Sequence, residues 1–82
     1  MIYIVLSSIT YANKAKNLLN SNNIKCEIVQ TPNTIAGRKC SYSITVDKKS
    51  SQLAIDIVAI NDCHLLGVYE CRDGGMYEHM MD

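Results

Sequence analysis

The amino-acid sequence predicts a single α+β domain whose elements follow the order β-α-β-β-α-β. Three observations predict this class. The chain has 82 residues, enough for one domain with a modest core. Four short runs have the β-branched or alternating pattern of strands: 2–6, 24–29, 40–46 and 65–70. Two amphipathic segments separate the first run from the second and the third from the fourth, as helices would.

The first strand and the first helix have clear boundaries. "IYIVL" (2–6) is an apolar run of strand length, and from residue 11 the pattern is helical. Asn22 and Asn23 can end this helix, because asparagine tolerates the left-handed conformation. Three N-cap candidates come before it: Ser7, Ser8 and Thr10. Its apolar face comprises Tyr11, Ala12, Ala15, Leu18 and Leu19.

A long loop separates the two middle strands. Residues 24–29 alternate as in a half-buried strand, and 30–39 hold the only proline together with a glycine. Long ordered loops are often functional. The third strand then begins with Cys40. Its predicted core face is Cys40, Tyr42, Ile44 and Val46, opposite Ser41, Ser43 and Thr45.

The second helix follows Asp47, a candidate N-cap, and covers roughly 48–61. Its predicted apolar side comprises Leu53, Ala54, Ile57, Val58 and Ile60. After the last strand, residues 72–82 contain Gly-Gly and no sustained period. We therefore expect one domain over 1–71 and a mobile C-terminal tail over 72–82.

These elements fit the split βαβ, or ferredoxin-like, arrangement: a four-stranded antiparallel sheet with both helices on one face. Right-handed crossovers predict the strand order 4-1-3-2. The other face is expected to show Tyr3, Val5, Val29 and the Ser/Thr row of the third strand. That mixed surface could serve a homodimer or another partner.

Composition argues against several classes of function. Eight basic and eight acidic residues give zero formal net charge, which disfavours nucleic-acid and membrane-surface binding. No run approaches the length of a membrane span, and the N-terminal segment lacks signal-peptide features, so we expect a cytoplasmic location. Reduced thiols are then expected at Cys26, Cys40, Cys63 and Cys71. Their spacing lacks a C-x-x-C pair, and neither a metal nor a cofactor is predicted.

The topology predicts that one end of the sheet collects the chemically interesting residues. Strands one and three are neighbours, so Cys40 is expected beside Ser7 and Ser8 at the start of the first helix. A helix N-terminus carries partial positive charge, and Arg38 would add to it. Such surroundings lower a thiol pKa from about 8.5 and favour the nucleophilic thiolate. The hypothesis is that Cys40 is a reactive thiol, with Cys63 and His64 as possible auxiliary residues at the same end.

Each of these candidate site residues also has a purely structural explanation. The pattern around Cys40 fits packing as well as reactivity, and Cys63 and His64 also suit a simple helix end. Cys26 is expected to be a core residue, and no role is predicted for Cys71. The methionines and His79 of the tail could attract copper(I), although chance composition explains them as well.

The same residues resemble a family of small bacterial domains, the selenium/sulfur carrier-like proteins. The likeness covers roughly 2–71. It includes the opening strand followed by "SSITYANKAKNLL", then "IKCEIVQTP", a cysteine that opens the third strand, and "GVYE". Thr31, Pro32 and Cys40 match the family pattern. Asn33 stands where members have arginine, and Ser41 where they have glycine after the cysteine.

The resemblance implies a carrier rather than a turnover enzyme. Cys40 would accept sulfur or selenium from a donor such as a cysteine desulfurase, hold it as a persulfide or selenosulfide, and pass it to an acceptor enzyme. Ser7, Ser8 and Arg38 would stabilise the anionic atom. Two alternatives stay open: an interaction or regulatory module that uses the sheet face, and a redox sensor that pairs Cys40 with Cys63. The sequence does not distinguish sulfur from selenium.

Overall fold

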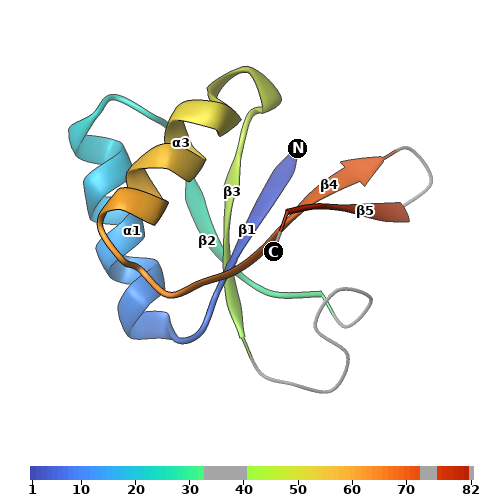
Figure 1. Cartoon of the computed structure of the whole chain (residues 1–82), viewed down its shortest axis with the longest axis horizontal. Helices are drawn as coiled ribbons and strands as arrows, with labels where there is room; N and C mark the ends of the chain where they lie inside the picture. The colour runs from blue at the N-terminus through green and yellow to red at the C-terminus, as the bar shows by residue number, and fades with distance from the viewer. Residues whose placement is uncertain (33–40, 73–75, 82) are drawn as a thin grey trace.

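The computed structural model describes residues 1–32, 41–72 and 76–81. The elements are β1 (Ile2–Leu6), α1 (Ile9–Ser21), β2 (Glu27–Gln30), β3 (Tyr42–Val46), α3 (Lys48–Ile60), β4 (Leu65–Arg72) and β5 (Met76–Met81). The first six follow the predicted order β-α-β-β-α-β, so the ferredoxin-like fold is confirmed. Both helices lie on the same side of the sheet (Figure 1).

The sheet has the order β2-β3-β1-β4-β5, and each neighbouring pair is antiparallel. Its first four strands reproduce the predicted order 4-1-3-2. The register places Ile4 of β1 between Ile44 of β3 and Val68 of β4. All three side chains are fully buried, and they form the centre of the core beneath the helices.

A fifth strand extends the sheet beyond the predicted four. β5 pairs with β4, with Tyr69 opposite His79 and Cys71 opposite Tyr77. Sequence analysis predicts no strand within 72–82, because this segment shows no sustained alternation of apolar and polar residues. An edge strand can form on backbone hydrogen bonds alone, without such a pattern. The division of the chain at residue 71 and the mobility of the tail stay predictions.

Both helices end in the same backbone motif. The N–H of Ile24 donates to the carbonyl of Leu19 at 2.9 Å, and the N–H of Cys63 donates to the carbonyl of Val58 at 3.3 Å. The asparagine (φ 63°) and the aspartate (φ 51°) that precede Ile24 and Cys63 are left-handed. This is the Schellman arrangement, in which an apolar residue after the left-handed one turns back onto the helix. It explains why Ile24 and Cys63 are both buried.

The buried face of α3 differs from the predicted one. It consists of Ser51, Ala54, Ile55 and Val58, spaced as one helical stripe. Leu53 is 54% exposed and Ile60 is 81% exposed, so their assignment to the core is wrong. Apolar residues lie on more than one side of this helix, which made its periodicity ambiguous. Ser51 can be buried because its hydroxyl donates to the Lys48 carbonyl at 2.6 Å.

The sheet face opposite the helices is also more covered than the sequence suggests. Val5 is only 4% exposed, and Ser43 is fully buried. Tyr3 and Val29 are half-buried. The Ser/Thr row of β3 is therefore part of the interior, and the expectation of an open, mixed surface at Val5 and Ser43 is wrong.

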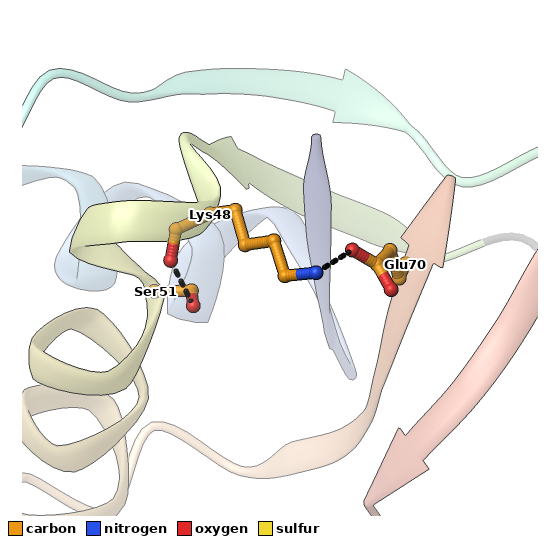
Figure 2. A network of polar contacts seen from close by, with 3 residues as sticks. All are labelled: Lys48, Ser51 and Glu70. Carbon is orange, nitrogen blue, oxygen red and sulfur yellow. Dashed lines mark hydrogen bonds and ion pairs between the residues drawn. The ribbon is translucent and has the colours of Figure 1, made fainter. Parts of the chain in front are cut away.

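An ion pair ties the start of α3 to β4. The Lys48 ammonium lies 3.0 Å from a carboxylate oxygen of Glu70 (Figure 2). The Glu70 side chain is largely buried, whereas that of Lys48 is mostly exposed. The contact therefore joins a helix end and a strand at the edge of the core, where water screens it only in part.

The N-cap of α1 provides a test of this description. Ser8 is extended, and its hydroxyl accepts a hydrogen bond from the Tyr11 N–H at 3.4 Å. We expect Ser8→Ala to lower the free energy of unfolding by about 1 kcal/mol, because a first-turn N–H loses its acceptor. Urea denaturation would measure the change.

The neighbouring Ser7→Ala substitution is the matched control. Ser7 is exposed and is not the N-cap, so we expect little change. Equal losses in the two variants would contradict the assignment of Ser8 as the cap.

Candidate functional site

The ends of the central strands bring four of the predicted site residues to one end of the sheet: Ser7, Ser8, Cys63 and His64. Leu6, the last residue of β1, is paired with both Tyr42 of β3 and Leu65 of β4. The chain segments next to these residues therefore meet there. We call this region the loop end, and it comprises Ser7, Ser8, Thr31, Ser41, Cys63 and His64.

Cys40 and Arg38 lie outside the described residues, so their roles stay predictions. The residue that follows Cys40 is described. Ser41 is buried, and its carbonyl accepts a hydrogen bond from the Thr31 N–H at 3.0 Å. The chain thus enters β3 from a point that is held against the end of β2.

A second hydrogen bond strengthens this junction. The hydroxyls of Thr31 and Ser43 lie 2.7 Å apart, and both side chains are buried. We call Thr31, Ser41 and Ser43 the loop clasp, because they join the two ends of the segment 32–40. The sequence did not indicate a role for Thr31 or Ser43. Extending the second predicted strand to residue 31 would have placed Thr31 opposite Ser41, on the face that carries Ser43.

The start of α1 supplies the electrostatic feature of the loop end. The first turn contains no acidic residue, so no carboxylate there opposes the partial positive charge of the helix N-terminus. Ser8 uses a lone pair to accept from Tyr11, and its own O–H can still donate. Ser7 is exposed beside it. The amides at the first two helical positions have no partner within the helix by geometry.

His64 is held over this helix start by an aromatic stack. Its ring lies 4.2 Å from the ring of Tyr11, with 24° between the planes. The side chain remains exposed. His64 also has a φ of 55°, a left-handed conformation that histidine adopts more readily than most residues. Sequence analysis placed Tyr11 only on the apolar face of the helix and gave no signal for this partnership.

Cys63 is placed for packing. Its side chain is 1% exposed, and its Sγ lies 3.9 Å from the Asn61 carbonyl oxygen. Burial raises the pKa of this thiol, and the nearby Lys14 only partly opposes the effect. Lys14 itself donates to the same Asn61 carbonyl at 3.0 Å. In this arrangement the Cys63 thiol is neutral near pH 7, and an auxiliary role in sulfur chemistry would require it to become exposed.

The other described cysteines are also unsuited to nucleophilic chemistry at this end. Cys26 is buried, as predicted, and burial raises its pKa despite the opposing charge of Lys16. Cys71 is half-buried and pairs within β4–β5, away from the loop end. Cys26 and Cys63 are free thiols.

The described residues were also compared with the requirements of a metal site and of a membrane-spanning helix. Among the side chains of residues 1–32 and 41–71, no three from His, Cys, Asp or Glu are grouped so that they could hold a metal ion. Neither α1 nor α3 has the length and apolar character needed to span a bilayer.

The burial of Cys63 leads to a labelling prediction. We expect iodoacetamide to modify Cys63 far more slowly in the folded chain than in urea, because the thiol is shielded and kept protonated. Since its pKa is raised, the residual rate should still increase with pH where an ordinary thiol has levelled off. Peptide mass spectrometry would report both rates. Equal labelling of Cys63 in folded and unfolded protein would contradict the buried position.

One of three comparisons with known proteins supports the family resemblance seen in the sequence. No curated protein and no solved structure matched the chain. A family match covers residues 1–70, which span β1 to most of β4 and include Cys40 and the loop clasp. The chain therefore belongs to the family described as "Putative Se/S carrier protein-like".

Proposed function

We propose that this protein carries sulfur or selenium on Cys40, as a persulfide or selenosulfide, and passes it to an acceptor enzyme. The family match over residues 1–70 is the observation that carries the proposal. The state of the other cysteines supports it. Cys26 and Cys63 are buried with raised pKa values, and Cys71 lies away from the loop end. Cys40 is the remaining thiol, directly before a residue of the loop clasp.

The transfer needs no oxidant. The Cys40 thiolate attacks the outer sulfur of a persulfide on the donor protein, so a new sulfur–sulfur bond forms at Cys40. The donor's sulfur–sulfur bond breaks, and its electron pair leaves on the donor cysteine as a thiolate. The acceptor thiolate then attacks the same outer sulfur, and Cys40 leaves as a thiolate. With selenium the steps are equivalent.

The loop end offers groups that suit an anionic terminal atom. The N-terminus of α1 favours negative charge, and the Ser8 O–H can donate while its oxygen caps the helix. Ser7 is exposed next to it. We assign Ser7, Ser8 and Arg38 to stabilising the bound chalcogen. We assign an auxiliary role to His64, whose exposed ring is stacked on Tyr11 of the first helix turn.

The alternatives gain no support from the described residues. Exposed side chains at Tyr3 and Val5 would have favoured an interaction module on the sheet face, but Val5 is buried and Tyr3 is half-buried. A redox sensor required Cys63 to be accessible, and this thiol is almost fully enclosed. Strands β3 and β4 also lie two strand spacings apart, on either side of β1, roughly 10 Å. A disulfide needs Cα atoms within about 7 Å.

Mass spectrometry of the loaded protein tests the carrier function. After incubation with a cysteine desulfurase and cysteine, we expect the intact protein to gain the mass of one sulfur atom, and a thiol reductant should remove it. Selenocysteine in place of cysteine tests for selenium in the same way. The gain should disappear in Cys40→Ser.

Cys71→Ser is the matched control, because Cys71 is the most accessible of the described cysteines. This variant should load like the natural sequence. A sulfur adduct that persists in Cys40→Ser would reject the assignment of Cys40, and no adduct on any cysteine would reject the carrier function with this donor.

A further inference from the structure

The loop clasp is a buried polar junction in a part of the molecule that could have been apolar. Thr31 and Ser43 are 4% and 0% exposed, and their hydroxyl oxygens lie 2.7 Å apart. Each hydroxyl satisfies the other, as buried polar groups require. A valine at residue 31 would have nearly the same shape without the need for a partner. The hydrogen bond between the two hydroxyls therefore fixes the relative orientation of the Thr31 and Ser43 side chains, which apolar packing alone would leave less defined.

The clasp acts on both ends of the same loop. The Thr31 side chain bonds to β3 at Ser43, and its backbone N–H bonds to the carbonyl of Ser41. These two contacts set the position of the chain that leaves β2 relative to the chain that enters β3. Ser41 is joined to Cys40 by a single peptide bond, so the contact at Ser41 constrains the point from which Cys40 extends.

We infer that Thr31 is a positioning residue for the Cys40 thiol, acting through the loop clasp. This inference rests on the proposed function of Cys40. The favourable field of a helix N-terminus falls off within its first turn, so the ionisation of a thiol near it depends on where the thiol is held. Small displacements of reacting groups also reduce rates strongly. Thr31 itself touches neither the sulfur nor a partner in this scheme.

The test compares Thr31→Val with Thr31→Ser in the full chain, with Cys71→Ser present in both to remove a competing thiol. The measurement is the alkylation rate of Cys40 by iodoacetamide as a function of pH, together with urea unfolding. Thr31→Val should shift the pH profile upward and slow the reaction near pH 7, by up to about tenfold for each unit by which the thiol pKa rises, because the thiolate is the reacting form. Thr31→Ser keeps the hydroxyl and should restore the original profile.

Thr45→Val is the matched control. Thr45 is buried on the same strand and the same face as Ser43, two residues further from the loop. We expect its pH profile to match that of the natural sequence even if its stability falls. Ser43→Ala removes the same hydrogen bond from the other side and should reproduce the Thr31→Val shift, which keeps the test decisive if Thr31→Val does not fold.

The outcomes separate this inference from the proposed function, because alkylation requires no sulfur donor. Identical profiles in Thr31→Val and Thr45→Val would overturn the positioning role, whether or not Cys40 loads sulfur. A shifted profile in Thr31→Val and Ser43→Ala, combined with no sulfur adduct at Cys40, would uphold the positioning role and overturn the carrier function.

Discussion

The arrangement of this molecule depends on β1 being paired on both sides. Ile4 lies between Ile44 and Val68, and this fully buried row supports both helices from below. The same pairing ends with Leu6 opposite residues of β3 and β4. Segments that are far apart in sequence are thereby brought to one end of the sheet. The hydrophobic row and the candidate site are consequences of a single register.

A small domain has few residues with which to build a hydrophobic core, and in this chain Cys26 and Cys63 are part of that core. Cys63 closes the Schellman motif of α3, and Cys26 is buried close to the chain of α1. Both behave as small apolar residues whose thiols stay protonated. Both thiols therefore serve the packing of the core, and the proposed sulfur chemistry is assigned to Cys40 instead.

A carrier makes modest demands on its scaffold. Each transfer exchanges one sulfur–sulfur bond for another, so the protein needs a thiolate, a site that tolerates negative charge, and access for two partners. The capped start of α1 and the exposed residues around it meet the electrostatic part of this requirement. The loop clasp joins Thr31, at the end of β2, to Ser41 and Ser43, at the start of β3, on either side of the segment that carries Cys40. No dedicated cavity is required by this chemistry.

The sequence by itself determined the order of the first six elements and the ferredoxin-like topology, because local periodicity and crossover handedness can be read from a single chain. It narrowed the N-cap of α1 to Ser7, Ser8 and Thr10, among which the structure selects Ser8. It also nominated Cys40 as the reactive thiol, and this role stays a prediction. Only the tertiary structure decided which apolar residues of α3 face inward, since Leu53, Ile55 and Ile60 are equally apolar in sequence. It also decided that β5 pairs at the edge and that Thr31 meets Ser43. The stacking of His64 on Tyr11 was likewise decided by the tertiary structure. Contacts between residues distant in sequence depend on strand register and helix placement, and neither can be read from the local composition of the chain.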